Sequence, residues 1–484
     1  MISRKLLLYI AANVALLGVS IAAFSGPALR LYSRLPALGR WLVDFGYRRF
    51  VVLATLLALA GIAFVYLGPE PPSPVIRADG QGYFAYLPAY VIYHDPTFKK
   101  VAEDFKHGEP LVYDFGKGLT LDQNTGNYLE RYGMGEAVLM LPFFLAGHLL
   151  AIVTGSELDG YSTYEHAAAA LSGLFYMFAG VWLLRSVLSR YFSRGVVLAT
   201  LVSIVFGTSL FHYATYDSIF SHAYSFFLIT LMVWLLPRFY EAERHRWRWV
   251  VALGVAAGLI LLVRNQNVVA LLLVPLFGLG SIPDVRARLG FFRSHLLQSA
   301  AVPALAAVVF IPQMLAWQVA TGHLLVFSYE GSGGAGSQSF QWLNPSFPQV
   351  LIAFYPHGLL PWAPVLTFAL VGLVFLRRSH PRLFYGTLVV LVLNTYVIAS
   401  WFVWFYGGGF GHRQFIDTLA LAALPLAAFY AALKPSWLRG AVFVVAGLLI
   451  MSTLLQMYHF WQHLVPIAGM PRGEYFRVLV SGKP

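Results

Sequence analysis

Cysteine is absent from all 484 residues, which excludes disulfide bonds, thiolate metal sites and cysteine nucleophiles. Charged residues are scarce: they make up 11% of the chain, against about 25% in typical soluble domains. The sequence contains no P-loop, HExxH or Gly-x-Ser-x-Gly motif, so nothing indicates nucleotide binding. Hydrophobic residues make up 58% of the chain. Because polar groups could not cover a water-soluble surface of this composition, we expect an integral membrane protein.

Apolar runs recur along the whole chain, and several approach the roughly 20 residues that a helix needs to cross a bilayer. One pair of runs is short and is separated by the polar sequence Arg264-Asn265-Gln266-Asn267, which predicts two short helices meeting at a hinge. The pattern predicts an all-α polytopic protein of about twelve spans, with both termini outside. The runs lie at 6–24, 50–67, 166–186, 196–213, 219–237, 249–263, 268–281, 297–318, 358–376, 383–402, 415–433 and 440–459.

The net charge of +12 is mainly a topology signal and does not indicate nucleic acid. Six connections hold 20 of the 33 basic residues and only four acids, whereas 68–165 holds 13 acids and 6 basic residues. The positive-inside rule therefore places the six connections in the cytoplasm and 68–165 outside. The connections are 25–49, 185–194, 238–248, 282–293, 377–382 and 434–439.

One apolar run, 133–153, breaks the alternation of sides. It is long enough to cross, but it contains Glu136, Pro142 and His148, and crossing would put the basic loops after it outside. We therefore expect a helix lying at the outer surface. The chain is predicted to be a single transmembrane domain over 1–484 with two large outer loops.

The two outer loops cover 68–165, which includes juxtamembrane helices, and 320–357. We expect 68–165, 321–350 and 403–414 to lie outside. Tryptophan is common at the interface between membrane and water, so the alternative for the aromatic residues of these loops is that they are simply membrane anchors.

Asp79 is the main catalytic candidate. It follows an apolar run by a dozen residues, beside Gly80 and Gly82, with Tyr83 and Tyr86 available for sugar contacts. A carboxylate at the outer surface can act as general base on an acceptor hydroxyl. The alternative is that Asp79 only caps the following helix.

Arg264 and Arg413 are predicted at the outer ends of spans, where topology does not demand positive charge. Because a planar guanidinium binds phosphate well, they are candidates for a phosphate site. The alternative is that Arg413 pairs with Asp417, four residues on, and that Arg264 extends to the interface. The other candidate substrate contacts are Arg131, His222, Tyr329, His357 and Trp404, and His222 alone is equally a structural histidine.

A family resemblance rests on several of these features together. They are the aspartate in the first outer loop, the aromatic segment after it, the helix pair split by an arginine, and Trp401-x-x-Trp-Phe-Tyr-Gly-Gly-Gly-Phe-Gly-His-Arg413. Over roughly 50–475 the chain resembles the bacterial GT-C superfamily of polyprenyl-phosphate-sugar glycosyltransferases. The glycines either let backbone approach a ligand or make a tight loop.

The resemblance implies an inverting hexosyl or pentosyl transfer from a polyprenyl-phosphate carrier to an envelope glycan, lipid or lipid-linked acceptor. It implies a bacterial plasma membrane, an active site facing the periplasm or exterior, Asp79 as base, and Arg264 and Arg413 at the donor phosphate. No metal and no other cofactor are expected. The alternatives are a lipid-linked glycan ligase or polymerase, or a transporter or flippase; a transporter would place polar residues in broken helices near the midplane.

Overall fold

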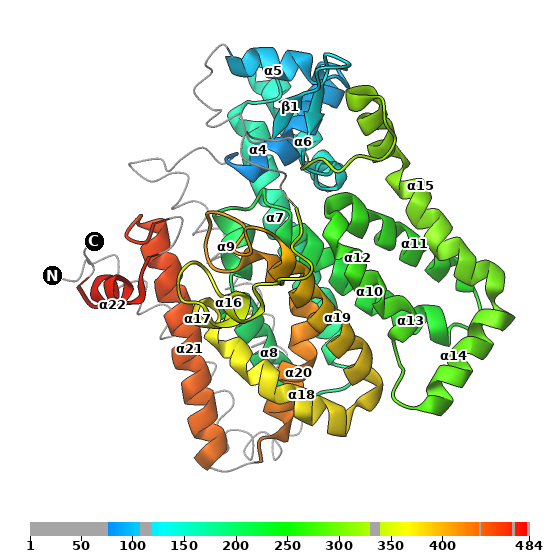
Figure 1. The fold of residues 1–484 in the computed structure, drawn as a ribbon, viewed down its shortest axis with the longest axis vertical. Helices are drawn as coiled ribbons and strands as arrows, with labels where there is room; N and C mark the ends of the chain where they lie inside the picture. The colour runs from blue at the N-terminus through cyan, green and yellow to red at the C-terminus, as the bar shows by residue number, and fades with distance from the viewer. Residues whose placement is uncertain (1–75, 107–117, 330–338, 435–436, 467–469, 482–484) are drawn as a thin grey trace.

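The computed structural model describes residues 76–106, 118–329, 339–434, 437–466 and 470–481. The predicted spans at 6–24 and 50–67 and the two chain ends lie outside these residues. Eight of the described helices are long and apolar enough to cross a membrane (Figure 1), which confirms a polytopic all-α protein without testing the count of twelve. They are α6 (Gly135–Thr154), α7 (Thr163–Leu188), α10 (His222–Glu241), α11 (Arg246–Val263), α15 (Leu296–Thr321), α19 (Pro381–Ser400), η5 with α20 (Arg413–Thr418 and Leu419–Ala432) and α21 (Trp437–Trp461).

Shorter helices complete the bundle where polar or glycine residues interrupt the apolar runs. The predicted run 196–213 is divided, because α8 ends before Gly207. The hinge at Arg264 is present: α11 ends at Val263, and Arg264 is extended with φ −151° and ψ 111°. The shorter elements are α8 (Arg194–Phe206), α9 (Leu210–Thr215), η3 (Asn265–Asn267), α12 (Val268–Leu271), α13 (Leu273–Leu276), α14 (Ile282–Ser294), α18 (Thr367–Ser379) and α22 (Arg472–Ser481).

Small residues let the long helices pack closely. A Cβ on Gly258 of α11 would lie 2.5 Å from Cβ of Val309 in α15, and one on Gly372 of α18 would lie 1.9 Å from the carbonyl oxygen of Pro425 in α20. Neither approach is possible with a larger residue. Close backbone contact of this kind replaces the hydrophobic effect as the force between helices in lipid.

A small cap of helices and one hairpin covers one end of the bundle, at the top of Figure 1. Its antiparallel strands pair Leu119 with Glu130 and Leu121 with Tyr128. A second group of short elements lies between α15 and α19, where Phe340 forms an isolated bridge with Trp401. The cap consists of α4 (Asp79–Leu87), η1 (Pro88–Ile92), α5 (Lys99–Lys106), β1 (Leu119–Leu121) and β2 (Tyr128–Glu130); the second group consists of α16 (Phe347–Ile352), α17 (Leu359–Trp362) and η4 (Pro364–Leu366).

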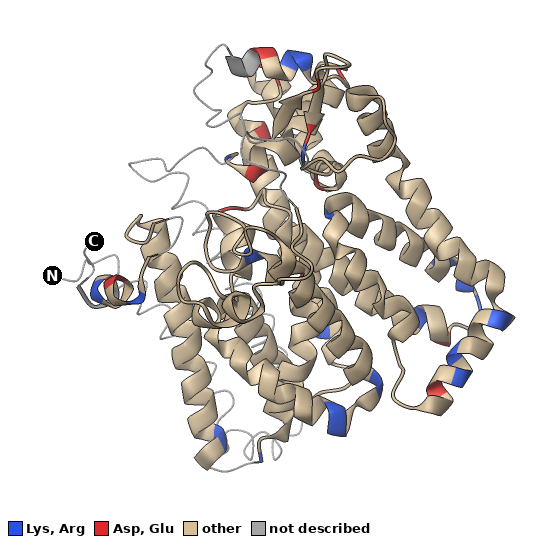
Figure 2. Cartoon of the chain, viewed as in Figure 1, with Lys and Arg blue, Asp and Glu red and all other residues tan. Residues whose placement is uncertain are grey.

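Charge separates the two ends of the bundle. Figure 2 shows acidic segments gathered on the cap, and basic segments around α14 and at the far ends of α18, α19 and α21. The positive-inside rule assigns the basic end to the cytoplasm, so the cap is predicted to be outside.

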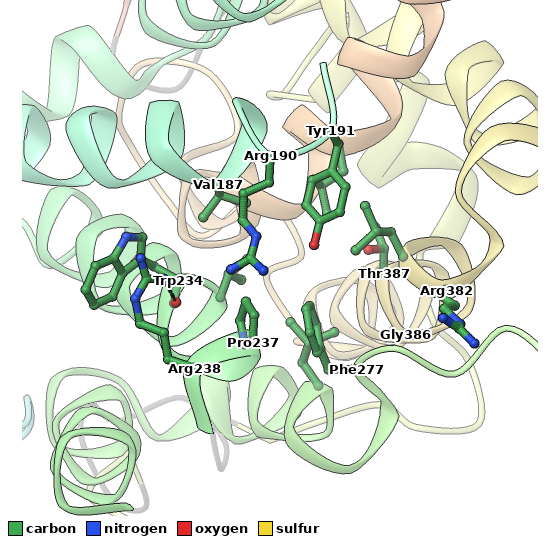
Figure 3. A pocket seen from close by; sticks show the side chains of 14 residues that line it. Val187, Arg190, Tyr191, Trp234, Pro237, Arg238, Phe277, Arg382, Gly386 and Thr387 are labelled. Atoms are coloured by element: carbon green, nitrogen blue, oxygen red, sulfur yellow. Dashed lines mark hydrogen bonds between the residues drawn. The ribbon is translucent and has the colours of Figure 1, made fainter. Parts of the chain in front are cut away.

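The arginines of the basic end lie against aromatic rings and acids. Around a small pocket between α7, α10 and α19 (Figure 3), the guanidinium of Arg238 stacks 3.4 Å from the ring centre of Trp234. Nearby, Arg190 pairs with Glu241 at 3.0 Å. The second contact joins the end of α7 to the end of α10.

Helix α6 begins against the end of α11, where a Cβ on Gly135 would lie 2.4 Å from the backbone nitrogen of Val263. It then runs antiparallel to the first half of α7: the Tyr176 hydroxyl donates to the Leu139 carbonyl, and a Cβ on Gly147 would lie 2.7 Å from the Tyr164 carbonyl oxygen. Because α6 is apolar enough to cross a membrane by itself, the prediction that 133–153 stays at the outer surface remains open.

That topology can be tested by single-cysteine labelling, since the native chain supplies no competing thiol. We expect Glu157→Cys, after α6, to react with a membrane-impermeant maleimide added outside. Arg286→Cys, in the exposed part of α14, is the matched control and should react only after permeabilisation. Labelling of Glu157→Cys from the cytoplasmic side alone would show that α6 crosses.

Candidate active site

The chain presents Asp79 on a turn with unfavourable backbone geometry. The Gly80 backbone nitrogen donates to the Arg77 carbonyl at 3.0 Å, which closes a four-residue turn with Ala78 as its first central residue. Ala78 has φ +47° and ψ −129°, a combination that turns normally give to glycine. Strained residues of this kind cost about 1–3 kcal/mol and persist only where surrounding contacts hold them.

Contacts behind the turn hold Arg77. Its Nε and Nη2 donate to Oδ1 of Asp217 at 2.8 and 2.6 Å, and its guanidinium lies 4.0 Å from the ring centre of Tyr216. Nε2 of His212 lies 2.8 Å from the other oxygen, Oδ2 of Asp217. Burial acts to raise the pKa of Asp217, but Arg77 and His212 outweigh it and hold that pKa below its ordinary value. Asp217 is therefore an ionised partner of Arg77.

Asp79 itself faces away from Arg77. Its Oδ1 accepts from the Tyr132 hydroxyl at 2.9 Å, and its Oδ2 lies 2.8 Å from Nη2 of Arg413. The side chain is 23% exposed. Burial raises the pKa of Tyr132 well above its ordinary value, so at neutral pH its phenol keeps the proton that it donates to Asp79.

Gly82 permits this arrangement. A Cβ there would lie 2.4 Å from Cδ2 of Tyr132 and 2.5 Å from Oε1 of Glu130. Only glycine lets both side chains pack against α4. Tyr132 therefore occupies the space beside Gly82, a role that the sequence alone had not indicated.

Asp79 opens onto a cavity of about 560 Å³ between the cap, the hinge after α11 and the loops around α19. Of the predicted site residues, the structure brings six to this cavity: Asp79, Tyr83, Arg131, Arg264, Tyr329 and Arg413. Its apolar part is formed by side chains from α12, α15, α19 and both adjoining loops. They include Val268, Val269, Trp317, Phe327, Phe340, Trp342, Val397, Trp401 and Phe402.

Arg264 and Arg413 converge on the cavity, but each has a carboxylate partner. Arg264 Nε lies 3.2 Å from Oδ2 of Asp417, and its Nη1 donates to Oγ of Ser221 at 3.1 Å. The alternative pairing of Arg413 with Asp417 is wrong. Residues 413–418 form a 3₁₀ helix, in which side chains four apart do not lie above one another, so Arg413 turns to Asp79 instead.

Arg131 is the cavity arginine without an acidic partner among the described residues. Its guanidinium lies 5.5 Å from the ring centre of Tyr329, and its Nε is buried without a hydrogen bond. The Ser328 hydroxyl donates to its carbonyl at 2.7 Å. The segment between β2 and α6 thus supplies both Arg131 and Tyr132 to the site.

Four predicted substrate contacts do not line the cavity. The buried Tyr86 hydroxyl donates to the Tyr132 carbonyl at 2.8 Å, and His222 lies behind the site with Nδ1 2.9 Å from Oδ1 of Asp417. His357 is buried against Trp362, and Trp404 lies beside Phe405 and His412. In this structure Tyr86 and His222 support residues of the site, and direct contact with substrate stays a prediction for all four.

The three glycines at 407–409 allow the loop before Arg413 to lie close against the bundle. Gly409 has φ +151°, and a Cβ on it would lie 2.5 Å from the Tyr213 hydroxyl. The next backbone nitrogen, that of Phe410, donates to the same hydroxyl at 3.2 Å. This contact fixes the loop that ends in Arg413, while Gly407 lines the cavity.

Glu130 lies buried under Tyr132, whose backbone nitrogen donates to its Oε1 at 3.1 Å. Burial raises the pKa of Glu130 from 4.5 to about 8. At neutral pH this carboxyl is therefore mostly protonated. No group of three or more metal-ligating side chains occurs in the part of the chain that the structure describes.

The buried carboxyl makes stability depend on pH. Folded protein holds the Glu130 proton up to about pH 8, whereas unfolded chain releases it near its ordinary pKa of 4.5, so stability falls as pH rises between these values. We expect the melting temperature of Glu130→Gln, relative to wild type, to rise from about pH 5 to about pH 9. The exposed Glu157→Gln is the control, and parallel curves for Glu130→Gln and wild type would contradict the prediction.

Comparison with known proteins places the fold. No family model and no curated protein match the sequence. Among solved structures, the archaeal oligosaccharyltransferase AglB from Archaeoglobus fulgidus, in complex with an inhibitory peptide and a dolichol-phosphate, is similar over 90% of this chain and 58% of its own, with a TM-score of 0.50 and 12% identity. ArnT from Cupriavidus metallidurans is similar over 84% of this chain and 63% of its own, with a TM-score of 0.48 and 14% identity.

The fold is thus similar to that of AglB, and the chain spans about three fifths of the length of these two proteins. At these identities the likeness concerns the fold alone, and activity has to be argued from the site.

Proposed function

We propose that the protein is an inverting glycosyltransferase that moves a sugar from a polyprenyl-phosphate carrier to a hydroxyl acceptor on the outer face of the membrane. The observation that carries the proposal is the position of Asp79 at the wall of a cavity that three arginines and an apolar surface also line. The solved structure of AglB, whose fold is similar, is a complex with a dolichol-phosphate, which is a polyprenyl-type phosphate.

In this reaction the acceptor oxygen attacks the anomeric carbon of the sugar while the bond to phosphate breaks on the opposite face. Asp79 accepts the hydroxyl proton, a contribution typically worth about 10²–10⁴-fold. Tyr132 and Arg413, which contact its two oxygens, orient the carboxylate. The phosphate leaves with the bonding electrons, and the arginines stabilise its growing negative charge.

The charge of the cavity supports a carrier with one phosphate. Arg413 is matched by Asp79 and Arg264 by Asp417, while Arg131 has no such partner in the described residues. One positive charge is left over. It matches the single negative charge of a sugar phosphodiester better than the two charges of a diphosphate, so it favours a monosaccharide donor over the alternative of a diphosphate-linked glycan ligase or polymerase.

The apolar part of the cavity suits the isoprenoid chain. Its aromatic side chains come from α15, the second outer loop and the loop that follows α19. The Trp342 side chain is half exposed. The polar groups that matter lie at the cap end of the bundle and not at its middle, which disfavours a transporter.

Asp79→Asn tests the proposed base. The amide keeps the size of the carboxylate and can still accept from Tyr132, but it cannot take the acceptor proton, so we expect transfer to fall by about 10²-fold or more with a native-like melting temperature. The assay is release of polyprenyl phosphate from a panel of polyprenyl-phosphate sugars with membrane glycolipid acceptors. Asp95→Asn, in the same loop, is the control. Wild-type turnover by Asp79→Asn would rule Asp79 out.

Arg131→Gln and Arg264→Gln separate phosphate binding from structure. Among the described residues, Arg131→Gln takes a partner from no carboxylate, so we expect a wild-type melting temperature. We expect the affinity for undecaprenyl phosphate to fall by about tenfold or more, which corresponds to the loss of one hydrogen bond to a charged group. Arg264→Gln takes a partner from the fully buried Asp417 and should destabilise the fold by on the order of 3 kcal/mol. Unchanged undecaprenyl phosphate binding by Arg131→Gln in nanodiscs would contradict the donor-site assignment.

A further inference from the structure

Two sets of contacts hold the turn at Ala78, one made by Asp79 and one made by Arg77. Only the first set is expected to change during the proposed reaction. On one side, Asp79 contacts Tyr132 and Arg413, and all three residues line the cavity. A substrate phosphate entering that cavity competes for Arg413. The contacts on this side therefore change during a reaction cycle and cannot be the permanent restraint on the turn.

On the other side, Arg77 is held by a buried chain of polar contacts that does not line the cavity. The indole nitrogen of Trp461, at the end of α21, donates to Nδ1 of His212 at 2.8 Å. Because Nδ1 of His212 accepts this hydrogen bond, the ring proton of His212 is on Nε2. Nε2 donates it to Oδ2 of Asp217 at 2.8 Å.

Both oxygens of Asp217 are thereby used, one by His212 and one by Arg77. Asp217 and His212 are nearly or fully buried, so the pair is shielded from water and salt. Nη2 of Arg77 also approaches the Tyr216 carbonyl at 3.3 Å. These contacts fix the residue directly before the strained Ala78, independently of what occupies the cavity.

We infer that Arg77, Asp217 and His212 are positioning residues that hold the Ala78 turn in its unfavourable conformation and so aim the Asp79 carboxylate into the cavity. The inference rests on the proposed function for its catalytic consequence. Its structural content can be measured without any substrate.

The first measurement is the reactivity of the Asp79 carboxyl toward a water-soluble carbodiimide with an amine nucleophile, read by mass spectrometry on full-length protein in nanodiscs. In wild type, Tyr132 and Arg413 protect Asp79. In Asp217→Asn the restraint on Arg77 is weakened and the turn can relax, so we expect labelling of Asp79 to rise about tenfold, the population change that strain of this kind corresponds to. Labelling of the exposed Glu157 in the same digest is the reference, and equal Asp79 labelling in both proteins overturns the inference.

Rescue distinguishes positioning from general stability. Glycine adopts the Ala78 conformation without strain, so Ala78→Gly in the Asp217→Asn background should restore protection of Asp79. Ala85→Gly in the same background is the matched control, because Ala85 lies inside α4 with helical geometry, and it should restore nothing. Failure of Ala78→Gly to restore protection, or equal rescue by both glycines, overturns the inference.

If Asp217→Asn does not fold, Arg77→Lys replaces it, since lysine keeps the charge but lacks the planar fork; the same labelling and rescue criteria apply. With a donor from the polyprenyl-phosphate-sugar panel, we expect Asp217→Asn to lower kcat about tenfold and leave KM for the donor unchanged, with recovery by Ala78→Gly. Wild-type kcat in Asp217→Asn refutes the positioning role, whereas wild-type turnover by Asp79→Asn refutes the proposed function.

Discussion

The ion pair between Asp79 and Arg413 joins the two parts of the molecule that the active site needs. Asp79 begins the first helix of the cap, and Arg413 begins the 3₁₀ helix that leads into α20 of the bundle. The pair is only partly exposed, so it is screened less than a surface salt bridge. This one contact between distant segments brings the Asp79 carboxylate and the Arg413 guanidinium to the same wall of the cavity.

Around this pair the polar groups form a layered arrangement. Arg264, which lines the cavity, contacts Asp417 in a second set that includes His222. Arg77, Asp217 and His212 make a third set, which does not line the cavity. In these two sets each carboxylate is paired with an arginine, Asp417 with Arg264 and Asp217 with Arg77, and such pairing offsets the cost of burying a charge. Arg131 has no carboxylate partner among the described residues. An unbalanced positive charge of this kind can attract an anion to the site.

Much of the fold and part of the candidate site could be predicted from the sequence. Apolar runs gave the spans because length and composition decide whether a helix can cross lipid, and the polar run at Arg264 gave the hinge. Arg264 and Arg413 were predicted at one phosphate site because each places positive charge at an outer span end, and the family resemblance added Asp79 to that site. The partner of Arg413 could not be predicted, because spacing of four residues suggests an α-helical pair and only the 3₁₀ geometry excludes it. The role of Tyr132 could not be predicted either. It depends on Gly82 allowing the hairpin to approach α4, and no local sequence pattern indicates a contact between such distant segments.

The separation of Arg77 from Asp217 along the chain, 140 residues, has a consequence for biogenesis. Membrane proteins are made from the N-terminus onward, at about 5–20 residues per second, so the Ala78 turn exists for roughly 7–30 s before its restraint has been synthesised. Arg413 comes later still. During that interval the contacts that hold Arg77 are absent, and the proposed positioning of the Asp79 carboxylate has to wait until Asp217 and His212 have been made. The proposed activity would therefore need the later part of the chain, because a product truncated before Asp217 would lack both this restraint and Arg413.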